Sequence, residues 1–350
     1  MVDRQSSPVA AGAETSQFRS EEHLEPRSPR VSVVVPVRDR RDLLGELLDA
    51  LVRQTYSDFE VVIVDDGSTD GSGDEARAAE ARGLRVRVER TRGVGAVEAR
   101  RIGVASSSGS VLAFTDSDCA PDPVWLAEGV AALDAGADLV VGPTMPAGPV
   151  RALERSVEAR SDDGLCATCN VFYRRAAYEQ AGGFSEAGRT LGFRWSSRAK
   201  QLGFGEDTIL AWRIRRSGRF SFVPSAVVRH AVLRPKIREI LWRTWVAGAF
   251  PALVKSVPEL RRTLVIGGIW LGSPRRAPVY ALIVGAALPW RLWLAPLAAV
   301  WWVFERARAV RRTPGSRLRR LIAVPVEMTT DVLTAAALIG GSIRSRTILL

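Results

Sequence analysis

The chain is poor in the residues that form disulfide frameworks and zinc sites, because its 350 residues include only 3 cysteines and 2 histidines. Three thiols cannot build a set of disulfides, so we expect a reducing, cytosol-facing compartment. Cys166 and Cys169 have the C-x-x-C spacing of half a zinc site, but no second pair of ligands accompanies them. We therefore interpret both as small buried residues on a strand.

Residues 1–28 lack the apolar stretch of a signal peptide. They are rich in Ser, Ala, Glu and Arg, a composition typical of a disordered leader. The whole chain is 47% hydrophobic and 25% charged, as expected of a folded protein. Its length favours one large domain with an appendage.

Acidic residues are scarce in the last third of the chain. From Arg229 to the end there are 20 Lys/Arg and 5 Asp/Glu, a net charge of +15, whereas the preceding residues have a net charge of −4. A basic tail indicates either nucleic acid or an anionic membrane as a partner. The aromatic residues of this tail lie within apolar runs rather than among the basic residues, which argues against nucleic acid.

The first half of the chain alternates between β-branched runs and helical patterns. The predicted strands are 31–36, 59–64, 84–88 and 110–114, and the predicted helices are 41–54, a polar segment ending near 81, and 95–105. This alternation predicts an α/β fold with right-handed crossovers, in which helices flank a mixed, mostly parallel sheet.

Three polar clusters directly follow predicted strands, at residues 36–39, 65–68 and 116–118. In open α/β sheets, ligands bind beyond the carboxyl ends of the strands, so we expect these clusters to meet in one site. Asp116 and Asp118 can present two carboxylates to one divalent cation, which would neutralise a diphosphate. The alternative is that they cap a helix beginning near Asp122.

Two other motifs are less specific. Glu206 and Asp207 begin a helical pattern, where a favourable interaction with the helix dipole, worth ~0.3–1 kcal/mol, also explains acidic residues. Gly93 and Gly95 begin a pattern similar to G-x-G-x-x-G, but Glu98 occupies the place of the third glycine. A nicotinamide-dependent oxidoreductase is therefore not favoured.

Five segments between residues 31 and 218 together form a recognisable ordered set: VSVVVPVRDR, DFEVVIVDDGSTD, GVGAVEARRIGVASSSGSVLAFTDSDCAPDPVWL, CATCNVFYRRAAYEQAGGFSE and GFGEDTILAWRIRRSG. In this order they resemble the family 2 inverting glycosyltransferases, which have a GT-A fold. The resemblance implies a hexosyltransferase of class EC 2.4. Such an enzyme moves a sugar from a nucleotide-diphospho-sugar, with a UDP-sugar favoured, to a hydroxyl acceptor.

The resemblance also implies a role for individual residues. Asp207 matches the catalytic base, with Glu206 as a less favoured substitute, and Gly183 matches a loop beneath the acceptor. The matches to donor-binding positions are Pro36, Asp65, Asp66, Arg100 and Asp116. The matches to ligands of Mn²⁺ or Mg²⁺ are Asp118, Asp116 and His230. For His230, the alternative is a histidine that ends a strand and has only structural partners.

The chain departs from the family pattern at two places. Processive synthases carry Gln-x-x-Arg-Trp after the base, whereas here Trp212-Arg213 stands without the glutamine, so we expect transfer of a single sugar. Arg101 stands where the family often has asparagine, which alters one polar contact. A single displacement assisted by one base inverts the anomeric centre and needs no second carboxylate as a nucleophile.

Two other functions stay open at this stage. A sugar nucleotidyltransferase shares the broad sheet architecture, but it would need a glycine-rich phosphate loop after the first strand, and residues 36–40 contain no glycine. A non-catalytic, membrane-associated scaffold that retains the fold is the alternative outside enzymes. Neither is favoured over the glycosyltransferase.

The tail has an apolar section at residues 277–304 with one charge, Arg291, and internal prolines that keep its apolar runs shorter than the ~20 residues of a spanning helix. Seven arginines between 306 and 320 follow it. Activated sugars and positive loops both lie on the cytosolic side, so we expect a re-entrant or interfacial hairpin, or a pair of crossings. Tryptophans 290, 293, 301 and 302 suit the headgroup level.

These patterns predict a GT-A domain at 29–232 and a basic, Trp-rich, membrane-associating helical region at 233–350, at the cytoplasmic face of the cell membrane. Within it, 235–246 fits an amphipathic surface helix and 321–350 a packed or amphipathic helix. The expected acceptor is a lipid-linked or cell-envelope glycan precursor. The alternative is a soluble helical subdomain or an oligomer interface.

Overall fold

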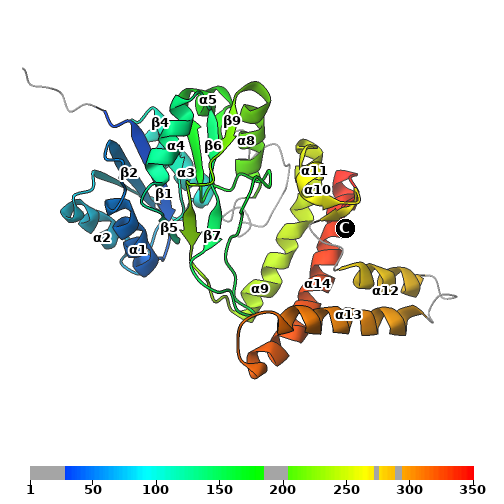
Figure 1. Cartoon of the computed structure of the whole chain (residues 1–350). Coiled ribbons are helices and arrows are strands. Elements are labelled where there is room, and N and C mark those ends of the chain that lie inside the picture. The colour runs from blue at the N-terminus through cyan, green and yellow to red at the C-terminus, as the bar shows by residue number, and fades with distance from the viewer. Residues whose placement is uncertain (1–27, 185–203, 272–275, 288–293) are drawn as a thin grey trace, which may run out of the picture.

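The computed structural model describes residues 28–184, 204–271, 276–287 and 294–350 (Figure 1). The leader predicted at 1–28 therefore lies outside the described residues except for Ser28. Tryptophans 290 and 293 also lie outside them, as does Arg291.

A seven-stranded sheet forms the centre of the first part of the chain, with the strand order β3-β2-β1-β4-β8-β6-β9. The neighbours β3, β2, β1 and β4 run parallel, and β8 runs antiparallel to both β4 and β6. The predicted mixed, mostly parallel sheet is thus confirmed. The strands are β1 (Val31–Val37), β2 (Phe59–Asp65), β3 (Val86–Arg90), β4 (Val111–Phe114), β6 (Leu139–Val141), β8 (Val171–Arg174) and β9 (Phe220–Phe222).

Helices cover both faces of this sheet because alternate residues of each strand point to opposite sides. Val33 and Val35 of β1 pack with leucines of α1, whereas Val34 packs in the cluster on the other face. Gly103 lets one helix approach closely, since a Cβ there would lie 2.5 Å from Cγ1 of Val34. One face carries α1 (Arg41–Val52), α2 (Ser72–Ala78) with the 3₁₀ turn η1 (Ala79–Arg82), and α4 (Trp125–Asp134); the other carries α3 (Ala96–Ala105), α5 (Arg175–Gln180) and α8 (Glu206–Ser217).

A second, three-stranded sheet has the order β5-β10-β7 and consists of β5 (Cys119–Pro121), β10 (Val228–His230) and β7 (Thr144–Pro146). β10 pairs antiparallel with β5, and His230 stands opposite Cys119. This register brings the end of β10 next to Asp118, although 112 positions separate Asp118 from His230 in the sequence. The second sheet therefore assembles part of the site described below.

The basic tail is helical and lies to one side of the sheet (Figure 1). The elements α9 (Ile237–Arg243), η2 (Thr244–Ala249) and α10 (Phe250–Ser256) follow one another, and the 29-residue helix α14 (Arg317–Ser345) packs along them. Gly248 and Gly341 allow this contact, because a Cβ on Gly341 would lie 2.2 Å from the carbonyl oxygen of Gly248. The remaining elements are α11 (Leu260–Thr263), β11 (Val265–Ile266), β12 (Trp270–Leu271), α12 (Ala277–Ala287) and α13 (Leu294–Arg311).

The hydrophobic core continues across the expected domain boundary at 232/233. Leu253 and Leu338 of the tail belong to the same buried cluster as Phe114 of β4. The described C-terminal helices therefore pack onto the sheet domain, and the division into two domains stays a prediction.

The helices α12 and α13 form a hairpin whose two arms lie side by side (Figure 1). α13 also joins α14 through a buried polar network, in which Arg306 donates two hydrogen bonds to Asp331 and the indole of Trp302 donates one at 2.9 Å. Among the described residues, α14 is the one helix long and apolar enough to cross a membrane, judged by length and composition.

Candidate active site

The turn between β4 and β5 carries Asp116 and Asp118, whose environments differ. Asp116 accepts a hydrogen bond of 2.7 Å from Nη2 of Arg100, a buried residue of α3. The helix that follows, α4, begins at Trp125 and has no side-chain cap. The alternative that Asp116 and Asp118 cap this helix is therefore wrong.

Asp118 faces His230, with 3.5 Å between Oδ1 and Nε2. Nδ1 of His230 lies 2.8 Å from the carbonyl oxygen of Ala231, a contact in which the ring nitrogen must donate. The neutral ring therefore carries its proton on Nδ1, and the lone pair of Nε2 points toward the carboxylate. Burial and the nearby charge of Asp116 raise the pKa of Asp118, against the opposite effect of the charge of Arg40.

This pair fits a divalent cation. Two lone-pair groups face each other at 3.5 Å, and a backbone carbonyl fixes the histidine in the tautomer that leaves Nε2 free for a metal. Cys119 lies within the same group of potential ligand atoms. Its thiol hydrogen-bonds with Cys169 and is buried, and both effects raise its pKa well above the ordinary value, so we exclude it as a thiolate ligand.

Arg100 connects the Asp-x-Asp turn to the acidic pair at the start of α8. Burial lowers the pKa of this guanidinium, but Asp116, Glu206 and Asp207 act in the opposite direction and leave the pKa raised. Arg100 is only 7% exposed, so its charge is poorly screened by water. One buried cation therefore interacts with acids from two separate elements.

Glu206 and Asp207 lie in the first turn of α8, after Gly205 with a φ of 75°. Burial and the like charge of Asp207 raise the pKa of Glu206 to about 7. Burial also raises the pKa of Asp207, although the backbone N–H groups of Thr208 and Thr168 donate to its carboxylate. Favourable placement in the helix dipole does not account for this burial, whereas a carboxyl whose pKa is raised toward neutrality suits a general base.

Asp66 follows β2 and contacts the loop before α3. Its carboxylate accepts hydrogen bonds from the backbone N–H of Val94 at 2.6 Å and of Gly95 at 2.9 Å, and from the hydroxyl of Thr91. Arg38 approaches it at 3.8 Å. Asp66 thus fixes the loop before α3, the helix that carries Arg100, and its predicted contact with a nucleobase stays a prediction.

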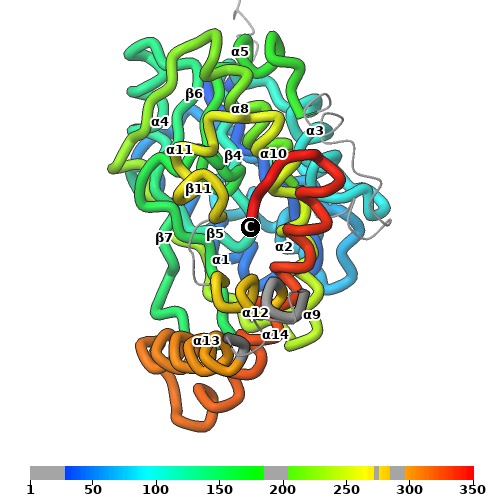
Figure 2. Tube along the Cα trace, turned by 90° about the vertical axis from the view of Figure 1, so that its right-hand side faces the viewer, coloured from blue at the N-terminus to red at the C-terminus, as the bar shows by residue number. Residues whose placement is uncertain are grey.

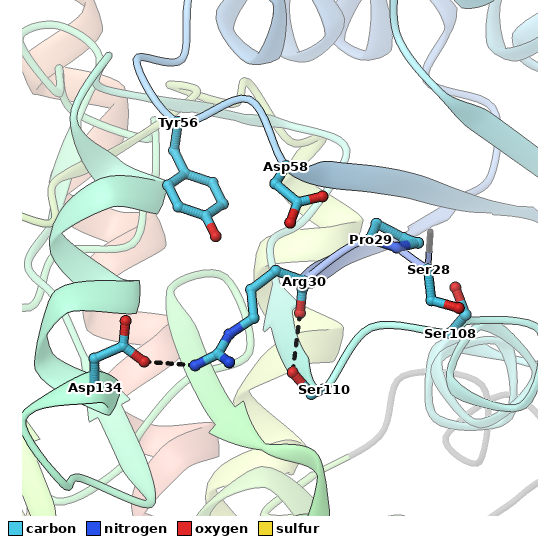
Figure 3. Close-up of a pocket in the computed structure, with 8 residues that line it drawn as sticks. All are labelled: Ser28, Pro29, Arg30, Tyr56, Asp58, Ser108, Ser110 and Asp134. Carbon is cyan, nitrogen blue, oxygen red and sulfur yellow. Dashed lines mark hydrogen bonds and ion pairs between the residues drawn. The ribbon is translucent and has the colours of Figure 1, made fainter. Parts of the chain in front are cut away.

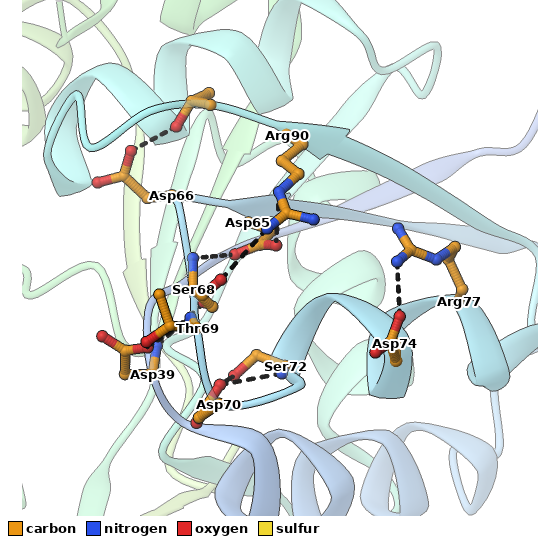
Figure 4. Close-up of polar contacts among 11 residues, drawn as sticks. Asp39, Asp65, Asp66, Ser68, Thr69, Asp70, Ser72, Asp74, Arg77 and Arg90 are labelled. Atoms are coloured by element: carbon orange, nitrogen blue, oxygen red, sulfur yellow. Dashed lines mark hydrogen bonds and ion pairs between the residues drawn. The ribbon is translucent and has the colours of Figure 1, made fainter.

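Asp65 points away from Asp66, into the turn that follows β2 (Figure 4). Its Oδ1 accepts from the backbone N–H of Ser68 at 2.8 Å, and its side chain is 1% exposed. A role of Asp65 in donor binding would therefore act through the shape of this turn. Oδ2 is buried without a hydrogen bond, 3.6 Å from Nε of Arg90.

Hydrogen bonds join this turn to the loop that follows β1 (Figure 4). Asp39, at a φ of 50°, accepts from the backbone N–H of Thr69 at 2.8 Å and donates its own N–H to the hydroxyl of Ser68 at 3.0 Å. Asp70 accepts from the N–H of Arg41 at 3.0 Å. The polar clusters at residues 36–39 and 65–68, which were expected to meet, are therefore in direct contact.

Pro36 and Gly183 occupy less informative positions. Pro36 is the penultimate residue of β1 and stands opposite Val64. Gly183 follows α5 with a φ of 53°, and a Cβ there would lie 2.8 Å from the ring of Tyr178. No described contact tests the predicted role of Pro36 in donor binding or of Gly183 beneath the acceptor.

The sequence did not point to Ser156, whose hydroxyl donates to the carbonyl oxygen of His230 at 3.0 Å. It also did not point to Arg155, on which Asp118 acts electrostatically. Neither residue belongs to a motif, and both reach the site because a long connection after β7 folds back. Cys166 and Cys169 are buried as expected, but they precede β8 rather than lying on a strand.

A polar pocket of about 420 Å³ lies at the other end of the sheet (Figure 3). Its lining includes Arg30, Asp58 and Ser110, which directly precede β1, β2 and β4. Arg30 pairs there with Asp134. This pocket lies at the amino ends of the parallel strands and contains none of the predicted site residues.

Comparison with known proteins agrees with this arrangement. Residues 32–198 match the family described as Glycosyl transferase family 2. The glycosyltransferase AglE of Haloferax volcanii is 34% identical over 192 residues, which cover 50% of this chain and 63% of that protein. The uncharacterized glycosyltransferase EpsJ of Bacillus subtilis is 37% identical over 90 residues, 26% of each chain. The chain thus spans less than two thirds of the length of these relatives.

Among solved structures, the mannosyltransferase PcManGT from Pyrobaculum calidifontis, in complex with GDP-Man and Mn²⁺, is similar to this chain. The two align with a TM-score of 0.50 and 20% identity, over 92% of this chain and 88% of the other. At this level of identity the likeness concerns the fold alone, and it confirms the predicted GT-A arrangement.

Proposed function

Because residues 32–198 match the family described as Glycosyl transferase family 2, we propose that the chain transfers a single sugar, with inversion, from a nucleotide-diphospho-sugar to a hydroxyl acceptor. The observation that carries this proposal is the convergence of two acidic motifs on one buried cation. Asp116 binds Arg100 directly, and Glu206 and Asp207 interact with the same guanidinium.

The proposed roles follow from the different environments of the Asp118–His230 pair and of the acidic residues at the start of α8. Asp118 and His230 would hold Mn²⁺ or Mg²⁺, with Asp116 beside them, and the metal would supply positive charge to the leaving diphosphate. Asp207 would take the proton of the acceptor hydroxyl as it attacks the anomeric carbon. Arg100 would hold Asp116 and Asp207 in a fixed mutual arrangement, so that donor and base are aligned before reaction.

The donor is defined by class only. PcManGT was solved with GDP-Man and Mn²⁺, which supports a nucleotide-sugar and a divalent metal for this chain as well. Uridine is the first base to test, followed by guanosine. Asp66, with Val94 and Gly95, would form the floor of the base pocket.

The direct test of this function is an assay of nucleotide-sugar turnover with and without Mn²⁺. We expect slow release of nucleotide diphosphate from a UDP- or GDP-sugar, dependent on the metal and faster with a hydroxyl acceptor. A panel of both bases with several sugars covers the open choice of donor. If no nucleotide-sugar is turned over and none raises the melting temperature with Mn²⁺, the proposed function is wrong.

We also propose that the tail holds the enzyme at the cytoplasmic face of the membrane. Leu297, Val300, Trp301 and Phe304 share one face of α13, at spacings of three and four residues, and are 48–69% exposed. Along the same face, the exposed side chains become basic at residues 308 and 311. An apolar face that ends in arginines fits an anionic bilayer surface.

Replacing both Trp301 and Phe304 by serine should weaken binding to vesicles of phosphatidylcholine and phosphatidylglycerol by at least about 100-fold, because each buried aromatic side chain contributes ~1.5–3 kcal/mol. Sedimentation with vesicles measures the loss. The matched control is Val124→Ser, an exposed apolar residue of the sheet domain. Equal binding of the double variant and the wild type would mean that this face of α13 does not contact lipid.

A further inference from the structure

Three arginines from separate elements gather beside the Asp118–His230 pair. Arg40 lies just before α1, Arg155 lies in the connection after β7, and Arg243 ends α9. Burial lowers the pKa of Arg155, and the charges of Arg243 and Arg40 lower it further. Burial also lowers the pKa of Arg243. Arg155 is thus near enough to both of the other guanidinium groups for their charges to act on it.

This arginine cluster (Arg40, Arg155 and Arg243) lacks the acidic partners that such groups usually have. Among the described residues, none of the three side chains donates a hydrogen bond or forms an ion pair within 4.0 Å. The charges that act on Arg155 in the opposite sense are those of Asp118 and Glu239. Arg40 and Arg243 are exposed and Arg155 is half-buried, so an anionic ligand can reach all three, and it would offset the repulsion that acts on Arg155.

Backbone contacts fix Arg155 close to the metal pair. Arg155 and Leu233 exchange two backbone hydrogen bonds, of 3.1 and 2.8 Å, and Leu233 lies three residues after His230. The next residue, Ser156, donates its hydroxyl to the carbonyl oxygen of His230 at 3.0 Å. The position of Arg155 therefore follows from the same contacts that hold His230.

The same connection also reaches the corner between α13 and α14. Ala152 packs with Val310 and Ala323, and its carbonyl oxygen accepts a hydrogen bond of 2.8 Å from Arg319. Figures 1 and 2 show this segment running from β7 to that corner. Four residues separate Ala152 from Ser156, which span at most about 14 Å. Arg155 thus lies on a segment that joins the α13–α14 corner to the residues beside His230.

We propose that the arginine cluster binds a phosphate group that enters the site from the membrane side. Arg155 and Arg243 would each donate hydrogen bonds to the phosphate oxygens, an arrangement for which guanidinium geometry is well suited. A donor diphosphate and a lipid-linked acceptor both carry such a phosphate, and the contact of this segment with the α13–α14 corner favours the acceptor. This inference rests on the proposed function for its biological meaning, whereas phosphate binding itself does not require turnover.

The test compares the wild type with the double variant R155Q/R243Q. The matched control R151Q/R238Q removes the same number of charges from exposed arginines in the same connection and the same helix. Calorimetry without metal measures binding of inorganic pyrophosphate, and we expect it to weaken by at least about tenfold in R155Q/R243Q only, because hydrogen bonds to charged groups are strong. Melting temperatures show whether each variant is folded.

Two further arms identify the source of the phosphate. One measures UDP and GDP binding with Mn²⁺; the other measures binding to phosphatidylcholine vesicles with and without phosphatidic acid. If R155Q/R243Q loses binding only to vesicles with phosphatidic acid, the cluster binds a lipid phosphate. If it loses binding of UDP or GDP, the cluster binds the donor. Unchanged binding of pyrophosphate, nucleotide and vesicles in a folded R155Q/R243Q overturns the inference, whether or not the wild type turns over nucleotide-sugars.

Discussion

Replacing Asp207 by Asn should reduce sugar transfer by about 10²- to 10⁴-fold, the range that general base catalysis contributes. The amide has nearly the same shape as the carboxylate but cannot accept the proton of the acceptor hydroxyl. Nucleotide diphosphate and metal should bind as in the wild type, because the metal pair is carried by the turn before β5 and by β10 rather than by α8. Steady-state transfer and nucleotide titration together measure the two effects.

A pH profile distinguishes a lost base from a distorted site. In the wild type, the pKa of Glu206 is raised to about 7 and that of Asp207 is raised as well. Because a base must be deprotonated, kcat/KM should rise with pH through a pKa above the ordinary range of an aspartate and then become constant. The residual rate of the Asp207→Asn variant should lack this rise. The control Asp122→Asn, in an exposed ion pair with Arg229, should retain both rate and profile. Transfer at the wild-type rate by Asp207→Asn would exclude Asp207 as the base.

The sequence was sufficient where the signal was local. The β-branched run of β1 and the leucine stripe of α1 predicted both elements to within two residues at either end, because periodicity alone determines which residues can be buried together. The polar clusters were also found, because a strand of a parallel sheet carries its ligand-binding residues at its carboxyl end. In this sense the edge of the sheet that carries the site followed from the sequence.

Contacts between distant segments could not be predicted in the same way. His230 comes beside Asp118 only through the register of β10 on β5, and no local pattern specifies that register. Arg155 belongs to a long connection without repeating hydrophobicity, so nothing in its sequence indicated a return to the site. The roles of Asp66 in fixing the 91–95 loop and of Arg100 in joining two acidic motifs likewise depend on tertiary packing.

The structure of the tail could also be predicted only in part from its sequence. The apolar runs at 277–304 suggested a hairpin at the membrane; α12 and α13 do form a hairpin, and its place in a membrane stays a prediction. Residues 321–350 were expected to form a packed or amphipathic helix rather than a span, and residues 317–345 form one helix through Pro325 that packs along η2 and α10. Its acidic residue Asp331 is neutralised by Arg306 of α13, a partner that hydropathy along a single segment does not reveal.

Replacing Asp118 by Asn should abolish the increase in nucleotide diphosphate affinity that Mn²⁺ produces, and with it turnover. An amide oxygen is a weaker ligand than a carboxylate and leaves the charge of the cation less neutralised. We expect at least about a 100-fold loss of metal-stimulated binding, since loss of even an outer-shell partner of a metal costs 10- to 100-fold. Calorimetric titration of UDP and GDP, with and without Mn²⁺, measures it directly.

The stability of the same variant provides the control for folding. Burial and Asp116 raise the pKa of Asp118, so the folded state holds that proton more tightly than the unfolded state does. For a carboxyl group this means that stability is lost as the pH rises from the unfolded pKa through the folded one. Without metal at neutral pH, Asp118→Asn should therefore melt at the same temperature as the wild type or higher.

His230→Gln tests the second ligand. It should reduce the increase in nucleotide affinity that Mn²⁺ produces without removing it, because Asp118 remains. Cys119→Ala removes the third potential ligand of the group. It should leave the effect of Mn²⁺ on nucleotide affinity unchanged, since the thiol of Cys119 is hydrogen-bonded with that of Cys169. If Mn²⁺ still raises nucleotide affinity in Asp118→Asn but no longer does so in Cys119→Ala, the metal ligand is Cys119 and not Asp118. The carboxylate of Asp118 is the decisive group. Its charge in a buried turn lowers the stability of the metal-free protein, and it becomes favourable only when a cation faces it.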